Sequence, residues 1–167
     1  MERAAGASLS IQKPRAVFDC MVYLQAVVRE TSPAAACLRL AEAHRTELFV
    51  SRKILAEVQD VLSRDYVRQR FDSITDEKCA QFIRRVRKAS TLLKRVPERF
   101  DYQQRDPKDE PYINLAVEVE ADYLVSRDND LLDLMNWNQE AGREFQKRFR
   151  FLTVVTPEVF LAKVEEE

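Results

Sequence analysis

The sequence predicts an α/β fold, a three-layer α/β/α sandwich around a mainly parallel central sheet. The main observation is that short β-prone runs alternate with helical runs along the chain, the pattern of a parallel sheet covered by helices. The second is length, since 167 residues suit one domain with one hydrophobic core. The third is that only two glycines occur, which excludes the glycine-rich phosphate loops of common nucleotide-binding α/β enzymes.

The first half of the chain already shows this alternation. In order, we expect a strand at 16–18, a helix at 33–44, a strand at 48–50, a helix at 51–62, a polar and partly helical connection at 65–72, a helix from 75 to about 93 and a short strand at 96. The helices carry apolar residues at helical spacing, as Ile54, Val58 and Val61 do. Ser51 and Thr75 are the expected N-caps, because their hydroxyls can accept from the first free backbone N–H groups.

The second half continues the alternation of strands and helices and adds one segment whose secondary structure the sequence does not define. In order, we expect a helix or turn from 106, a helix at 112–120, a strand at 123–126, a helix at 130–137, a polar and basic insertion at 138–150, a strand at 151–155 and a terminal helix from 156. Pro111 and Pro157 stand where a first helical turn tolerates proline, and Thr156 is the expected N-cap of the last helix.

The chain is expected to contain a single folded domain at 15–162. Residues 1–14 are polar and lack the apolar core of a signal peptide, so we expect a disordered leader, and 163–167 form an acidic tail. Three cysteines match no zinc motif, and the single histidine, His44, lies at the polar end of a helix and is given a structural role. No apolar run approaches the roughly 18 residues of a membrane span, so we expect a cytoplasmic protein.

The net charge of −1 hides an uneven distribution. Residues 52–105 contain 14 Lys and Arg against 8 Asp and Glu, whereas residues 106–133 contain 2 against 9. A basic region beside an acidic one suits an enzyme that holds a polyanion next to a cation-dependent site. For any single charged run taken alone, a solvated helix face is the better explanation.

Four carboxylates are candidates for a functional role, and a structural role remains open for two of them, Glu57 and Asp109. Asp19 and Asp128 follow two separate expected strands, and ligands of open α/β sheets bind beyond such strand ends. Glu57 lies at the edge of the apolar arc of its helix, although a surface glutamate is an equal alternative. Asp109 begins a helix, where an acid also favours the helix dipole.

Convergence of these acids would require a cation. Two carboxylates about 4 Å apart repel by about 4 kcal/mol at an effective dielectric constant near 20. Oxygen ligands favour Mg²⁺ or Mn²⁺, and such ions orient a phosphate, activate a water and stabilise the leaving oxygen. The four acids therefore predict metal-assisted hydrolysis of phosphodiester bonds.

Several segments occur in an order that resembles PIN-domain nucleases, in particular the VapC-like toxins of bacterial toxin–antitoxin systems. These segments are 17–23 with Asp19, 51–62 with Glu57, 106–109 with Asp109, 121–132 with the pattern Ser126-x-Asp128-x-Asp130, and 156–161. The resemblance covers roughly residues 15–162. It implies an α/β/α fold, dependence on Mg²⁺ or Mn²⁺, cleavage of single-stranded RNA, an antitoxin protein as partner and a homodimer.

The resemblance also implies roles for individual residues. Asp19, Glu57, Asp109 and Asp128 would be the catalytic, metal-binding acids. Asp130 would be a further metal ligand, and Ser126 would support the site through hydrogen bonds.

The chain departs from the family pattern in two places. Met21 stands where the family usually has Asn, and a thioether cannot donate the hydrogen bonds of an amide. Residues 136–150 are longer and more basic than the usual connection, and Arg143, Lys147 and Arg148 are candidates for RNA contact. A solvated helical hairpin or a dimer contact explains this segment equally well.

Two other functions remain open at this point. A catalytically weak or inactive scaffold on the same fold, binding RNA or protein, is motivated by Met21. An aspartyl-phosphate phosphatase or receiver-like domain is compatible with Asp19 at a strand end, but the phosphatase needs a second Asp two residues later, where Met21 stands.

Overall fold

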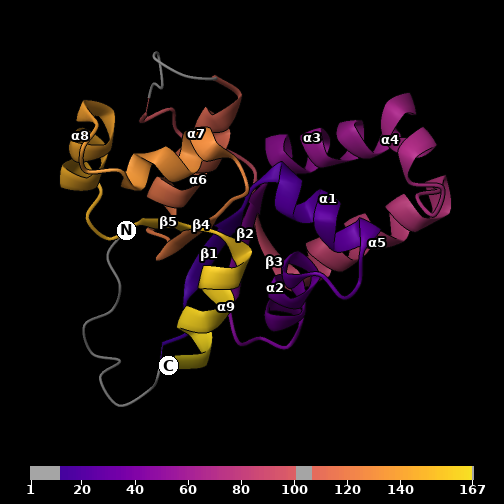
Figure 1. The fold of residues 1–167 in the computed structure, drawn as a ribbon. Helices are drawn as coiled ribbons and strands as arrows, with labels where there is room; N and C mark the ends of the chain where they lie inside the picture. Colours follow the sequence, from indigo (N-terminus) through magenta and orange to yellow (C-terminus); the bar gives the residue numbers. More distant parts are fainter. Residues whose placement is uncertain (1–11, 101–106, 167) are drawn as a thin grey trace.

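A five-stranded parallel sheet forms the centre of the protein (Figure 1). The computed structural model describes residues 12–100 and 107–166, so most of the expected leader lies outside the described part. The strands are β1 (Arg15–Phe18), β2 (Glu47–Ser51), β3 (Ser90–Leu93), β4 (Tyr123–Val125) and β5 (Thr153–Val155). Their spatial order is β3-β2-β1-β4-β5, and every neighbouring pair is parallel.

Helices cover the sheet on both faces. They are α1 (Cys20–Val28), α2 (Pro33–Glu42), α3 (Arg52–Ser63), α4 (Asp65–Arg70), α5 (Asp76–Ala89), α6 (Glu110–Glu118), α7 (Asn129–Leu132), α8 (Glu140–Arg148) and α9 (Pro157–Glu166), with 3₁₀ turns η1 (Pro107–Asp109) and η2 (Asp133–Met135). Helix α2 contacts α1, α5 and α9, while α6 contacts β1 and β4. Figure 1 shows α6, α7 and α8 gathered on the other side of the sheet from α2 and α5. The predicted α/β/α sandwich is confirmed.

The central position of β1 determines where the functional groups lie. Its residues Ala16, Val17 and Phe18 are at most 1% exposed, as expected for a strand flanked by β2 and β4 and covered on both faces. From β1 the chain adds β2 and β3 on one side of the sheet, and then returns to the other side of β1 to form β4 and β5. The direction in which strands are added therefore switches between β1 and β4. Such a switch point leaves a crevice beyond the carboxyl ends of the strands.

The expected N-caps begin their helices as predicted. The hydroxyl of Ser51 accepts from the backbone N–H of Ile54 at 3.1 Å, and that of Thr75 accepts from Lys78 at 3.1 Å. The hydroxyl of Thr156 accepts from the N–H of Val159 at 3.3 Å. These bonds satisfy N–H groups that the first turn of a helix leaves free.

The helix expected to reach residue 93 was predicted too long. Helix α5 ends at Ala89, where Ser90 turns extended and its hydroxyl donates to the carbonyl of Val86 at 2.6 Å. Residues 90–93 become strand β3, because pairing with β2 satisfies backbone groups at the edge of the sheet. Val96, expected in a strand, belongs to no strand.

The insertion at 138–150 is ordered around helix α8. Phe145 is 1% exposed, and its ring lies 5.6 Å from that of Phe100 and 5.2 Å from that of Phe149. A Cβ on Gly142 would lie 2.1 Å from the carbonyl oxygen of Asn136, so α8 approaches the preceding backbone very closely. The segment is therefore packed against the domain by its own aromatic cluster.

His44 follows the end of α2 in the left-handed backbone region, with φ of 59°. Its N–H donates to the carbonyl of Ala41 at 3.1 Å, and that of Arg45 donates to Leu40 at 2.9 Å. These bonds close the last turn of the helix and agree with a structural role. Among the described residues, no helix has the length and apolar character needed to cross a membrane.

Candidate active site

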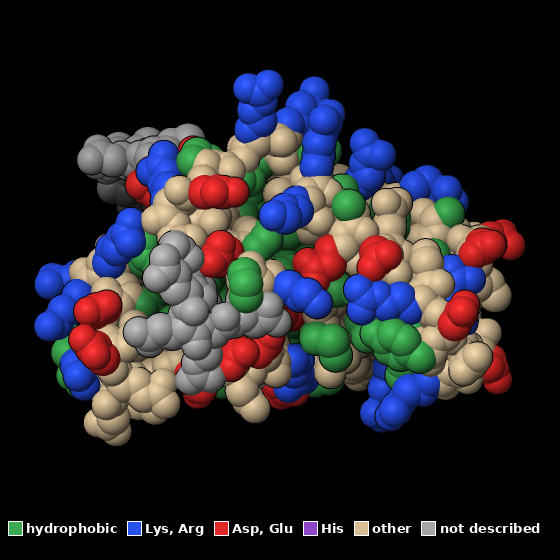
Figure 2. Space-filling view, turned by 90° about the horizontal axis from the view of Figure 1, so that it is seen from above, with side chains coloured by type: hydrophobic (Ala, Val, Ile, Leu, Met, Phe, Trp, Pro, Cys, Tyr) green, Lys and Arg blue, Asp and Glu red, His purple; other side chains and the backbone are tan. Residues whose placement is uncertain are grey.

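An open groove of about 710 Å³ lies beyond the carboxyl ends of β1 and β4. Four acids line it: Asp19 directly after β1, Asp128 shortly after β4, Asp109 immediately before α6, and Glu57 on α3. Figure 2 looks onto this end of the sheet and shows acidic side chains around a central hollow, with Lys and Arg at its margin. The structure thus brings together four acids that are far apart in the sequence.

Asp19 is the most enclosed of these acids, at 3% exposure. Its Oδ1 accepts from the backbone N–H of Val22 at 2.9 Å, which also caps α1. Its Oδ2 accepts from the hydroxyl of Ser126 and from the backbone N–H of Arg127, the latter at 3.1 Å. These three donors hold the carboxylate although Met21 supplies no amide.

The pKa of Asp19 is raised above its ordinary value of 3.8. Burial is the largest cause, and the charge of Asp128 adds to it, while the three hydrogen bonds act in the opposite direction. Without a positive partner, the ionised form is therefore disfavoured at this position. A nearby cation would stabilise the ionised form of such a buried carboxylate, so this position is well suited to bind one.

Ser126 links the acids at the ends of the two strands. It is 0% exposed, and its Oγ donates to Asp19 while accepting from the backbone N–H of Asp128 at 2.9 Å. Asp128 in turn caps α7, since its Oδ1 accepts from the N–H of Asp130 at 2.8 Å. One chain of hydrogen bonds thus fixes the position of this whole acidic segment.

The tightest group of acids consists of Asp109, Asp128 and Asp130. One carboxylate oxygen from each lies within 4.8 Å of the other two. Oxygens at such distances can share one divalent ion, because the ion lies about 2.0–2.6 Å from each of its ligands. Asp130, expected as a further ligand, is a member of this group, although it is not among the described residues that line the groove. Asp19 and Glu57 line the groove with Asp109 and Asp128 but do not belong to the group.

Glu57 is held by a residue that the sequence argument did not single out. The hydroxyl of Tyr112 donates to Glu57 Oε2 at 2.7 Å, and burial raises the pKa of this phenol. Tyr112 lies three residues after Asp109, and this spacing places both on one face of a helix. That spacing is the signal by which Tyr112 could have been found.

Cys20 lies in the wall of the groove, next to Asp19. Burial raises the pKa of its thiol to about 12, and the negative charges of Glu57 and Asp19 add to the effect. The sulfur is therefore a neutral thiol at physiological pH. It adds no charge to the acids around it.

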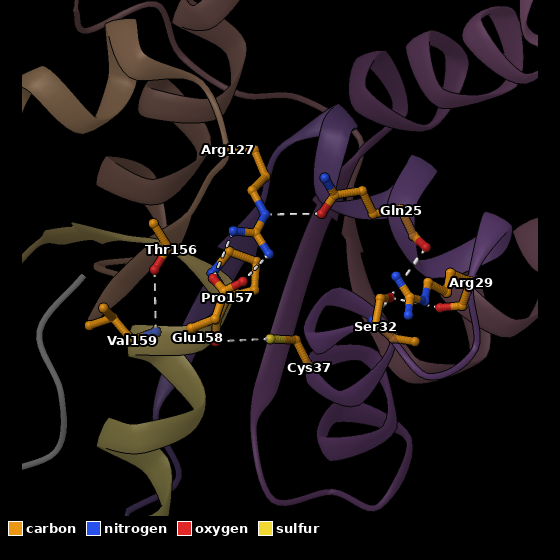
Figure 3. A network of polar contacts seen from close by, with 10 residues as sticks. Gln25, Arg29, Ser32, Cys37, Arg127, Thr156, Pro157, Glu158 and Val159 are labelled. Atoms are coloured by element: carbon orange, nitrogen blue, oxygen red, sulfur yellow. Dashed lines mark hydrogen bonds and ion pairs between the residues drawn. The ribbon is translucent and has the colours of Figure 1, made fainter.

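Arg127 ties the acidic segment to two distant helices (Figure 3). Its Nε donates to Gln25 Oε1 on α1 at 3.0 Å, and its two terminal nitrogens donate to the two carboxylate oxygens of Glu158 on α9, one of them at 2.7 Å. The backbone N–H of the same residue donates to Asp19. The side chain of Arg127 thus anchors the loop that holds the first acid.

Basic residues reach the groove from three directions. Lys53 on α3, Arg64 before α4 and Lys108 in η1 line it together with the acids. Positive side chains around a cluster of carboxylates provide contacts for a polyanion whose backbone approaches the acids.

The three basic candidates of the insertion lie elsewhere. Among the residues that line the groove in the described part of the chain, Arg143, Lys147 and Arg148 do not occur. Arg143 donates to the carbonyl of Trp137 at 3.0 Å, and Lys147 Nζ lies 5.8 Å from the centre of the Trp137 ring. Arg148 donates to the carbonyl of Arg99 at 2.8 Å. The contacts of Arg143 and Lys147 hold α8 to the preceding turn, and that of Arg148 joins α8 to the segment that follows β3.

A parallel α/β/α sandwich with carboxylates gathered beyond the carboxyl ends of its strands defines a class of protein that can bind a divalent cation next to a phosphate. Comparison with protein families matches residues 15–130 to the PIN domain, and the chain belongs to this family. The matched region contains every acid of the groove. PIN domains are generally nucleases. A search of curated proteins found no match.

Proposed function

We propose that this protein is a metal-dependent endoribonuclease that hydrolyses phosphodiester bonds of single-stranded RNA. The observation that carries the proposal is the group Asp109, Asp128 and Asp130, whose oxygens lie within 4.8 Å of one another. Two of its members, Asp109 and Asp128, line the groove together with Asp19 and Glu57. Acids so close together repel one another, and a divalent cation relieves the repulsion.

The donor set fits Mg²⁺ or Mn²⁺. Asp109, Asp128 and Asp130 would hold the ion, with Asp19 and Glu57 alongside, and every one of these ligands is a carboxylate oxygen. When bound, the ion supplies Lewis-acid chemistry, which orients the phosphate and makes a water molecule more nucleophilic.

The residues of the chain contribute positioning and charge. Ser126 and the backbone N–H of Arg127 fix Asp19, and the hydroxyl of Tyr112 fixes Glu57. Lys53, Arg64 and Lys108 attract the phosphates on either side of the bond that is cleaved. Hydrolysis adds one water across a P–O bond and yields one phosphate end and one hydroxyl end.

We also propose that the protein is the toxin of a toxin–antitoxin pair, with a separate antitoxin protein as partner and a homodimer as assembly. The support is the similarity of segments 17–23, 51–62 and 121–132 to VapC-like toxins. Co-purification with the product of a neighbouring gene, followed by loss of nuclease activity in the complex, is the expected result. A chain whose expression leaves growth unchanged while its purified form cleaves RNA would contradict the toxin role.

The nuclease proposal is tested with the purified chain and an end-labelled, unstructured RNA. Cleavage is expected with Mg²⁺ or Mn²⁺ and is expected to stop in excess chelator. Asp109→Asn and Asp128→Asn should each reduce the rate by at least a hundred-fold, because each removes a charged ligand. Asp72→Asn, which neutralises an exposed acid outside the groove, is the matched control and should leave the rate unchanged.

Undiminished cleavage by Asp109→Asn, or by the wild-type chain in chelator, would refute the mechanism. Calorimetry with Mn²⁺ separates the nuclease from the catalytically weak scaffold. Binding that is lost in Asp109→Asn supports the enzyme, whereas no binding by the wild-type chain supports the scaffold.

A further inference from the structure

A second hollow of about 590 Å³ adjoins the acid-lined groove beside α1 and α4. Three side chains line both spaces: Met21, Leu24 and Tyr66. A molecule that fills the groove can therefore extend past these residues into the second hollow. The volume of the second hollow lies within the range of natural small-ligand pockets, about 300–1,000 Å³.

Met21 and Tyr66 are unusually exposed for apolar side chains, at 44% and 61%. The position of Tyr66 is nevertheless defined, because Arg64 Nη1 donates to its hydroxyl at 3.2 Å and Arg64 is itself paired with Asp60 at 2.8 Å. The pairing leaves the ring at the junction of the two spaces. An exposed aromatic ring beside a thioether provides a flat apolar surface for another ring.

The charges of the two spaces differ. The groove is lined by four acids and three bases, whereas the second hollow is lined by Arg29, Arg70 and Arg127, with no Asp or Glu among its described lining residues. Because Arg127 is paired with Glu158, the positive charge of the hollow comes mainly from Arg29 and Arg70. Val28 and Phe71 add apolar lining to the same hollow. Apolar walls with guanidinium groups at the margin match a nucleotide, which has a flat base and an anionic phosphate.

We propose that the second hollow is a binding site for an unpaired nucleobase of the RNA, next to the phosphate held at the acids. The base stacks on the Tyr66 ring and against Met21, and the phosphate that follows it contacts Arg70 or Arg29. This inference rests on the proposed nuclease function and adds to it a subsite that favours single strands, because a base paired in a duplex cannot enter the hollow. Continuity with the acids favours RNA over a protein partner as the occupant.

The test uses short RNAs with 2-aminopurine at successive positions, whose fluorescence falls when the base stacks. Binding is measured in an Asp109→Asn background, so that the RNA stays intact. For one position of the probe, the fluorescence should fall on binding. Tyr66→Ala should abolish this decrease and weaken binding about ten-fold, as expected for the loss of one stacked base. Tyr66→Phe keeps the ring and should retain most of the decrease.

Phe151→Ala is the matched control, since Phe151 is an aromatic residue of 43% exposure outside both spaces. Equal binding and equal quenching with Tyr66→Ala would overturn the subsite and leave the nuclease proposal intact. If Tyr66→Ala instead leaves RNA binding unchanged but converts a dimer to a monomer in sedimentation, the hollow is a protein interface and the proposal is wrong. A wild-type chain that neither binds nor cleaves RNA would refute both proposals together.

Discussion

Ser126 is the residue on which the geometry of the acids depends most directly. Its hydroxyl donates to Asp19 and accepts from the backbone of Asp128, and no part of it is exposed. Replacing it with alanine leaves a buried carboxylate without one of its donors. An unsatisfied group of this kind costs about 1–3 kcal/mol, and a lost supporting bond near a metal ligand lowers metal affinity by about 10–100-fold.

We therefore predict that Ser126→Ala lowers both the affinity for Mn²⁺ and the free energy of unfolding. Calorimetric titration with Mn²⁺ and urea unfolding measure the two effects. Ser63→Ala is the matched control, because it removes an exposed hydroxyl that donates to the carbonyl of Gln59 within its own helix. Unchanged Mn²⁺ affinity in Ser126→Ala would show that the hydroxyl has no part in positioning the acids.

The sequence predicts some residues of the candidate site better than others. Asp19 and Asp128 were predicted from physical reasoning, because each follows a strand and strand ends meet at one edge of a parallel sheet. Glu57 required the family resemblance, since its place on α3 also suits a surface residue. Arg127 was missed, because its contacts with Gln25 and Glu158 join residues 102 and 31 positions apart and leave no local pattern.

At the scale of elements, the contact between the loop after β4 and helix α9 supports the site from a distance. Arg127 pairs with Glu158 through both carboxylate oxygens, and this pairing holds the pKa of Glu158 below its usual value. The pair is partly exposed, at 26% and 50%, so we expect it to contribute at most about 1 kcal/mol to stability. Its main effect is to orient the loop whose N–H donates to Asp19.

We predict that Arg127→Ala lowers kcat of RNA cleavage several-fold with a small change in the free energy of unfolding. Glu158→Gln should have a smaller effect in the same direction, and the exchange of both residues, Arg127→Glu with Glu158→Arg, should recover part of the loss. A double-mutant cycle on kcat and on Mn²⁺ affinity measures this coupling. If both single variants keep wild-type kcat, the contact has no role in positioning.

Helix α8 illustrates how closely an inserted element can pack. Gly142 lies so near Asn136 that an added methyl group overlaps the backbone. We predict that Gly142→Ala destabilises the protein by about 1–3 kcal/mol, as overpacking does elsewhere. Urea unfolding measures this change, with Ala141→Ser on the same turn as control. An unaltered midpoint would mean that α8 moves away from η2 without cost.

Elements were predicted well wherever local chemistry decides the outcome. Caps at Ser51, Thr75 and Thr156 begin helices as expected, since each hydroxyl bonds within three residues. The end of α5 and the position of β3 were predicted wrongly, because pairing with β2 decides them. The structure of residues 138–150, which contain α8, was not predicted for a similar reason. Phe145 packs against Phe100, which is far away in the sequence.

For the whole molecule, the buried acid gives folding a dependence on pH and on metal. The pKa of Asp19 is raised in the folded state, so its contribution to stability is fully present below about 3.8 and is lost as pH rises through the raised value. Relative to Asp19→Asn, which does not titrate, the metal-free wild-type protein should therefore lose stability as pH rises above 4. Mn²⁺ at a hundred times its Kd should add about 2.7 kcal/mol to the wild-type protein at neutral pH.

Urea unfolding across a pH series, with Mn²⁺ and with chelator, measures both effects. The Asp19→Asn variant should gain clearly less from Mn²⁺ than the wild-type protein. If the difference in the free energy of unfolding between the two proteins stays constant with pH, Asp19 does not titrate with a raised pKa in the folded state.

The order of the strands has a consequence for synthesis of the protein. Asp19 receives one of its hydrogen bonds from Ser126, 107 positions later, and β4 must join β1 before the two meet. A nascent chain that leaves the ribosome therefore lacks its acidic centre until most of the message has been translated. Under the proposed function, this order of assembly would keep the nuclease inactive toward its own messenger RNA for most of the time that the chain is being made.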